Sequence, residues 1–151
     1  MTENQKNELK KFNRLYKQLD ELYHEIALKS GLSDSAFAIL YTIVELGDGC
    51  LQTEIAEHNS ISKQTIHTSV KNLEKKGYLS FQRGKGRDMH IYLTEMGRKL
   101  TEEKILPVFE MENSIFAEMP QEERKQLLAL MEKYVGMFRE KSQQICNHLK
   151  P

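Results

Sequence analysis

Residues 62–93, SKQTIHTSVKNLEKKGYLSFQRGKGRDMHIYL, change their hydrophobic period part-way along. In the first half, apolar side chains recur at helical spacing, at Ile66, Val70 and Leu73. This spacing predicts a helix over 62–76 with one buried face, and Gly77 is suited to end it. A short helix is predicted before it, over 52–58, and Asn59-Ser60 has the composition of a turn. Two short helices joined by a tight turn form a helix-turn-helix.

The second half of the same stretch favours strands. Residues 78–83 and 90–93 each predict a strand, and the polar residues 84–88 between them include a glycine at 84 and another at 86. We therefore expect a two-stranded ribbon with a basic tip, which is a wing. The predicted fold class is mainly α with a two-stranded β wing, a winged helix-turn-helix.

Further helices are predicted before this module. Apolar residues at helical spacing predict a long first helix over 9–29, ended by Gly31. A second helix is predicted over 33–46, and Ser33 is suited to cap it because its hydroxyl can accept from a free main-chain N–H group.

The chain after the wing also predicts helices. Thr94 is expected to cap one of them, and Pro107 is expected to bend or break it. Pro120 suits the first position of a final helix. The apolar residues of that helix are Leu127, Leu128, Leu130, Met131, Tyr134, Val135, Phe138 and Ile145.

The terminal helices carry more apolar residues than a small winged helix can cover, which predicts that two copies of the chain pair through them. The alternative is that the first helix packs on the last within one chain. The expected division is an N-terminal dimerisation helix (1–32), a winged helix-turn-helix domain (33–97) and C-terminal dimerisation helices (98–151).

Composition restricts the class of protein. Apolar residues make up 39% and charged residues 29% of the 151 residues, which is typical of a globular protein. No stretch approaches the roughly 20 apolar residues that cross a bilayer, and the first residues lack the apolar run of a signal peptide. A cytoplasmic location is therefore expected. Cys50 and Cys146 lie too far apart in sequence for a zinc motif, so no metal and no cofactor are expected.

The charge is unevenly distributed, although the net charge is zero. Between residues 62 and 90 there are seven basic and two acidic residues, which gives +5 there and −5 over the rest of the chain. A neutral chain with one basic module is typical of a protein that binds a polyanion.

The predicted helix over 62–76 has a polar face suited to the major groove of DNA, where short polar, amide and basic side chains reach base edges and phosphates. The candidate contacts on this face are Ser62, Lys63, Gln64, Thr65, His67, Thr68 and Lys71. Gln64 can bond adenine with both atoms of its amide. The ribbon adds Arg83, Lys85 and Arg87, which can reach an adjacent minor groove. An ordinary solvated polar face is the alternative for each set taken alone.

Four short motifs resemble the multiple-antibiotic-resistance regulator (MarR) family. They are Ile55-Ala56-Glu57, ISKQTI at 61–66, LEKKGYL at 73–79 and LTEMG at 93–97. The resemblance implies a triangular homodimer built from the N- and C-terminal helices, which binds a pseudo-palindromic operator as a repressor and releases it when a small molecule binds. The wing of this family usually carries Asp-x-Arg. Arg87 matches the arginine of that motif, whereas Lys85 stands in place of its aspartate.

The sequence fits other functions less well than a DNA-binding regulator. The chain has no Ser-His-Asp order, glycine-rich phosphate loop or supported carboxylate pair, so an enzyme is not expected. A metal- or redox-responsive regulator of the same fold is one alternative, with Cys50 as the candidate sensor, although a small buried thiol is the more ordinary role for it. A winged helix that binds only proteins is another, and its affinity would lack the salt dependence of phosphate binding.

Overall fold

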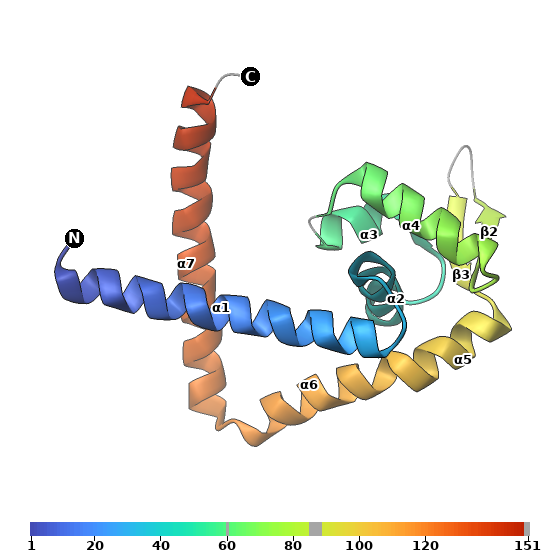
Figure 1. Cartoon of the computed structure of the whole chain (residues 1–151), viewed down its shortest axis with the longest axis horizontal. Helices are drawn as coiled ribbons and strands as arrows, with labels where there is room; N and C mark the ends of the chain where they lie inside the picture. Colours follow the sequence, from blue (N-terminus) through green and yellow to red (C-terminus); the bar gives the residue numbers. More distant parts are fainter. Residues whose placement is uncertain (60, 85–88, 150–151) are drawn as a thin grey trace. The chain divides into compact units, whose positions relative to one another are not determined.

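The computed structural model describes residues 1–59, 61–84 and 89–149 of the chain. Two compact units are present, Met1–Phe109 and Glu110–Pro151, and each is described by itself. The elements in chain order are α1 (Glu3–Lys29), α2 (Asp34–Leu46), β1 (Cys50–Leu51), α3 (Gln52–Asn59), α4 (Lys63–Lys75), β2 (Leu79–Arg83), β3 (Met89–Leu93), α5 (Glu95–Lys104), α6 (Leu106–Glu118) and α7 (Gln121–His148) (Figure 1).

Side-chain caps fix the starts of several helices. The predicted caps are confirmed at Ser33, whose Oγ accepts from the Ala36 N–H, and at Thr94, whose Oγ1 accepts from the Gly97 N–H. The first helix begins at Glu3 rather than near residue 9, because Thr2 forms a capping box with the residue three positions on. The capping box lies before the first residue of the periodic apolar pattern, so the pattern alone does not show where the helix begins.

The core of the first unit is built around α2. Its side chains Ile39, Leu40 and Ile43 are fully buried. α3 and α4 lie beside α2 and add Ile55, Ile66 and Val70 to the same core (Figure 1). The helix-turn-helix therefore has a hydrophobic core within one chain, and α4 is held by its apolar face.

The sheet has three strands in the order β1-β3-β2. The two predicted strands of the ribbon are present and antiparallel, with Leu79 opposite Leu93 at one end and Arg83 opposite Met89 at the other. The third strand, β1, was not predicted. It has only two residues, Cys50 and Leu51, which pair with β3, and a strand of two residues leaves no period to detect.

The predicted break near Pro107 is confirmed. α5 ends at Lys104, Ile105 is fully buried between the two helices, and α6 begins at Leu106. Pro107 thus lies in the first turn of α6, where the missing N–H of proline removes no helical hydrogen bond.

The second unit contains most of α6 and the whole of α7. Pro120 is the N-cap of α7 and not its first helical residue, one position from the expectation. The guanidinium of Arg124 donates to the main-chain oxygens of Phe116 and Met119, which joins α7 to the end of α6. No residue of α7 is buried in the single chain, although the helix has 28 residues.

Candidate nucleic-acid interface

α4 has one buried and one exposed face. Ile66, Val70 and Leu73 are buried, as their spacing predicted. The buried Ser69 hydroxyl lies 2.7 Å from the Ser35 hydroxyl of α2, so a polar contact also joins the two helices. Every predicted contact residue of the helix is exposed: Ser62, Lys63, Gln64, Thr65, His67, Thr68 and Lys71.

The first turn of α4 orders three of these hydroxyls. Ser62 Oγ is the N-cap and accepts from the Thr65 N–H at 3.1 Å, and the two hydroxyl oxygens lie 2.8 Å apart. Thr68 Oγ1 donates to the main-chain oxygen of Gln64 at 3.0 Å. These hydroxyls can still accept a hydrogen bond from a base, whereas the amide of Gln64 and the ammonium of Lys63 are bonded to no other residue in the described ranges.

Lys71 and His67 point to neighbouring elements. Lys71 Nζ lies 2.9 Å from the carboxylate of Glu74 and 4.9 Å from the ring centre of Phe81 in β2. The Lys71 side chain is 55% exposed and that of Glu74 is 37% exposed, and solvent-accessible pairs are worth at most about 1 kcal/mol, so a phosphate can compete for the ammonium. The Nδ1 of His67 is 3.4 Å from the amide nitrogen of Gln52 at the start of α3.

The ribbon follows α4 directly. Arg83, the last residue of β2, is exposed and lies opposite Met89. β2 packs beside α4, so the structure brings Arg83 to the same module as the α4 residues. Lys85 and Arg87, the other two predicted wing contacts, lie outside the described residues.

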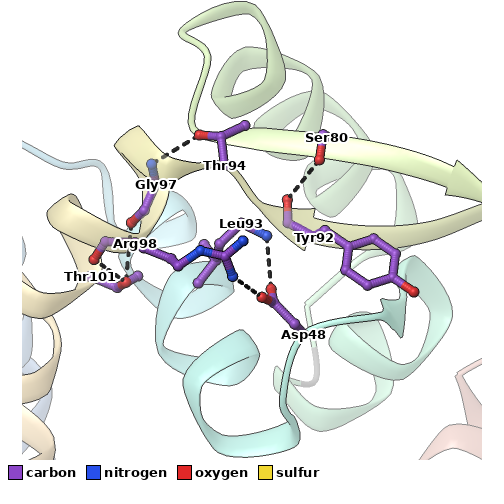
Figure 2. Close-up of polar contacts among 8 residues, drawn as sticks. All are labelled: Asp48, Ser80, Tyr92, Leu93, Thr94, Gly97, Arg98 and Thr101. Atoms are coloured by element: carbon purple, nitrogen blue, oxygen red, sulfur yellow. Dashed lines mark hydrogen bonds and ion pairs between the residues drawn. The ribbon is translucent and has the colours of Figure 1, made fainter.

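Sequence reasoning missed a cluster of polar contacts at the base of the wing (Figure 2). One carboxylate oxygen of Asp48 accepts from the main-chain N–H of Leu93 at 2.8 Å, and the other accepts from the guanidinium of Arg98 in α5. The Gly47-Asp48-Gly49 segment follows the predicted end of the second helix at residue 46, and no role was predicted for Asp48. An aspartate flanked by two glycines in a short loop was the available signal that this side chain has a specific task.

The same base is tied to the end of α4. Thr94 Oγ1 donates to the main-chain oxygen of Gly77 at 2.6 Å, and the Thr94 N–H donates to the main-chain oxygen of Tyr78 at 3.0 Å. Gly97 lies against this point, because a Cβ there would stand 2.0 Å from the Tyr78 oxygen. The Leu-Thr-x-x-Gly motif therefore acts as the joint between β3, α5 and the residues that end α4.

Cys50 is buried in β1 with 7% of its surface exposed. Burial, helped by the negative charge of Glu54, raises the pKa of its thiol to about 11. The reactive thiolate is therefore scarce near neutral pH, which disfavours a redox role. Within the ranges that the structure describes there is no group of three or more His, Cys, Asp or Glu side chains placed to hold a metal ion.

None of the described helices combines the length and the apolar composition needed to cross a membrane.

Solved structures share this fold. A MarR family regulator from Neisseria meningitidis aligns with a TM-score of 0.78 and 22% identity, over 91% of this chain and 97% of that one. Staphylococcus aureus MarR, solved with salicylate and kanamycin, aligns with a TM-score of 0.67 and 18% identity, over 90% and 93% of the two chains. The S. aureus MepR–DNA complex aligns with a TM-score of 0.66 and 22% identity, over 84% and 94%.

Sequence comparison points to the same family. No functionally curated protein matches the chain. The sequence model of the MarR family matches residues 30–88, which run from the end of α1 into the wing. Residues 30–88 are therefore similar in sequence to the MarR family, and the chain has the winged-helix fold of the solved MarR family regulators.

Proposed function

We propose that this protein is a sequence-specific regulator of transcription that binds double-stranded DNA as a homodimer. The observation that carries the proposal is the division of α4 into a buried apolar face and an exposed polar face that holds all the predicted contact residues of the helix, with the exposed Arg83 on the ribbon next to it. The N-terminal turn of α4 offers hydroxyl, amide and ammonium groups, which are the chemistry that reads base edges and binds phosphates in a major groove. The complex of MepR with DNA supports the same use of the fold.

The proposed dimer rests on α7. Its apolar side chains recur at intervals of three or four residues from Leu127 through Met131 and Tyr134 to Phe138, and again seven residues later at Ile145, and all are exposed in the single chain. A long exposed apolar stripe is unusual on a monomer, and each large side chain buried in an interface contributes about 1.5–3 kcal/mol. The exposed apolar residues of α1, at Leu15, Leu19 and Leu22, are available to the same interface. Two-fold pairing would present two α4 helices to successive major grooves, roughly 34–36 Å apart.

We further infer that the protein acts as a repressor and that a small molecule releases it from its operator. The S. aureus relative solved with salicylate and kanamycin supports an effector of this size. A reporter gene placed behind the bound site tests the sign of regulation, and expression should rise when the protein is deleted. Titration of the protein–DNA complex with salicylate tests release, and an unchanged affinity at saturating salicylate would remove that compound as the effector.

Selection of bound sequences from random duplexes tests the DNA-binding proposal. The selected site should be a pseudo-palindrome whose half-sites are one helical turn apart, since each protomer presents one α4. Light scattering should give the mass of two chains. Recovery of no preferred sequence, or an affinity that does not change between 50 and 200 mM salt (about the range in which phosphate contacts weaken most visibly), would contradict the proposal.

A further inference from the structure

We propose that Asp48 and Arg98 are positioning residues that hold the wing at a fixed angle to α4. We call these two side chains, with the main-chain N–H of Leu93, the wing clamp. Its effect on DNA affinity rests on the function proposed above, whereas its effect on the wing of the free protein does not. Among the residues that the structure describes, Asp48 is the one whose side chain joins the loop after α2 to both the end of β3 and α5.

The loop that carries Asp48 has little freedom to place it elsewhere. Gly47 and Gly49 on either side have φ angles of +93° and +94°, which side chains with a Cβ rarely adopt. A Cβ at Gly49 would also lie 3.1 Å from the hydroxyl of Tyr92 in β3. The backbone thus turns sharply on both sides of Asp48 and directs its carboxylate to the edge of β3.

The Asp48 carboxylate accepts a hydrogen bond from β3 beyond the point where the pairing with β1 ends. The Gly49 N–H donates to the main-chain oxygen of Ile91 at 2.8 Å, in line with the pairing of Cys50 opposite Ile91. Two residues further along β3, the Leu93 N–H would have no strand partner on that edge, and Asp48 supplies the acceptor at 2.8 Å. The end of β3 is therefore bonded on both edges, to β2 on one side and to Asp48 on the other.

The second carboxylate oxygen of Asp48 links the loop to α5. Arg98 lies in the first turns of α5, which begins at Glu95 directly after β3, and its guanidinium donates to Asp48. The Asp48 side chain is 29% exposed, so the pair is partly shielded from water. Because Thr94 ties the same point to Gly77 at the end of α4, the wing base is held between α4 and α5.

Restraint at the base matters because of the shape of the wing. Beyond His90 the wing has only two strands, and a two-stranded ribbon has little stability of its own, so its direction depends on the contacts that hold β3 below that residue. Arg83 lies four residues from Leu79, which is paired with Leu93 at the base, and this separation corresponds to roughly 13 Å of strand. β1 holds β3 at His90 and Ile91, and Asp48 holds it at Leu93. Without Asp48, β3 can rotate about its short pairing with β1, and this rotation moves Arg83 whereas Gln64 on α4 stays in place.

A double-mutant cycle on DNA affinity tests this prediction. Arg83→Ala should lower the affinity for the selected duplex in the otherwise unchanged protein. In the Asp48→Ala background the factor lost on Arg83→Ala should be smaller, by about threefold or more, since Arg83 is no longer held against the DNA. Gln64→Ala should lose the same factor in both backgrounds. An Arg83→Ala factor that is equal in the two backgrounds would overturn the proposal.

Variants of Arg98 separate positioning from a general loss of structure. Arg98→Ala should reproduce part of the Asp48→Ala effect, and Arg98→Lys should restore part of the loss because it keeps a cation near the carboxylate. The matched control is Lys99→Ala, which breaks the ion pair of Lys99 with Glu95 on the same helix, where both side chains are more than two-thirds exposed. The control should leave the Arg83→Ala factor unchanged, and equal behaviour of the Arg98 and Lys99 variants would contradict the clamp.

Amide hydrogen exchange in the free dimer distinguishes failure of the clamp from failure of the proposed function. The Leu93 N–H should exchange faster in Asp48→Ala than in the unchanged protein, and Asp48→Asn, which keeps an acceptor at Oδ1, should lie between them. Unchanged exchange at Leu93 in Asp48→Ala would overturn the clamp whether or not DNA is bound. Absence of DNA binding by the unchanged protein would instead overturn the proposed function and leave the exchange result to decide the clamp.

Discussion

α4 and α7 are both amphipathic helices, and they differ in what covers their apolar faces. The apolar face of α4 is covered by α2 and α3 of the same chain, and its key side chains are fully buried. The apolar stripe of α7 is longer, yet no residue of that helix is buried within its own compact unit. The comparison shows that hydrophobic spacing indicates a face that must be covered, whereas only the fold shows whether the same compact unit covers it.

The largest effect is expected from a charge on the α7 stripe. Phe138, which packs its ring 6.2 Å from that of Tyr134, is 62% exposed in the single chain. Phe138→Asp should convert the dimer to a monomer and lower operator affinity by more than about 100-fold, since a buried unpaired charge costs several kcal/mol. Light scattering and operator titration measure both effects. Lys133→Asp, on the opposite side of the same helix, is the control and should remain dimeric; a dimeric Phe138→Asp would show that α7 is covered by something other than a second copy.

The next effect concerns the buried face of α4. Ile66 is fully buried in the core of the winged helix. Ile66→Ala should lower the free energy of unfolding by about 2–5 kcal/mol through reduced burial and the cavity left behind. In denaturant titrations this decrease should be the same at every protein concentration, because the face is covered within one chain. A decrease that depends on protein concentration would mean that the core of this module also forms between chains.

A smaller effect is expected on the exposed face of the same module. Lys71→Ala and Arg83→Ala should each weaken binding to all duplexes and reduce the slope of log affinity against log salt by about 0.9 for each phosphate that is no longer neutralised. Gln64→Ala should instead reduce discrimination between the selected site and random DNA, since the predicted role of this uncharged amide is to bond a base. Unchanged salt slopes in both basic variants would remove these side chains from the interface. Equal losses of affinity for specific and random DNA would show that Gln64 reads no base.

The smallest expected effect is a difference in reactivity between the two cysteines, which reports the burial of Cys50 in β1. Because burial raises the pKa of the Cys50 thiol to about 11, the thiol stays protonated at pH 8 and becomes a thiolate only as the pH approaches that value. Iodoacetamide should therefore modify the exposed Cys146 at pH 8 and leave Cys50 intact. Unfolding in guanidinium should abolish the difference, and mass spectrometry of the peptides measures both. Rapid modification of Cys50 in the folded protein would reopen the redox alternative.

The fold was predictable where the signal was local. Spacing of apolar residues identified α2, α4 and the buried face of α4, and Ser33 and Thr94 were predicted as caps because a hydroxyl followed by helical spacing is a sufficient sign. The start of α1 was missed because the capping residue precedes the apolar period. The exposed polar face of α4 was also predicted, since it is the complement of the buried one.

The rest depends on contacts between residues far apart in sequence. The partners of Asp48 lie 45 and 50 residues further along the chain, so nothing near Asp48 announces them. β1 exists only because β3 lies beside it, and its two residues have no pattern of their own. What a short polar loop does is decided by the tertiary structure, and spacing along the chain carries no information about it.

The short connection between α4 and β2 constrains how sequences of this kind can change in length. Only residues 76–78 separate the two elements, and Gly77, with a φ of +80°, turns the chain there. Since successive side chains of a strand point to opposite faces, one inserted residue at this point would exchange the faces of Arg83 and Gln82 if it shifted the register of β2 against β3 by one. A register shift of this kind would carry Arg83 to the other face of the ribbon, so natural insertions in such proteins should avoid these three positions.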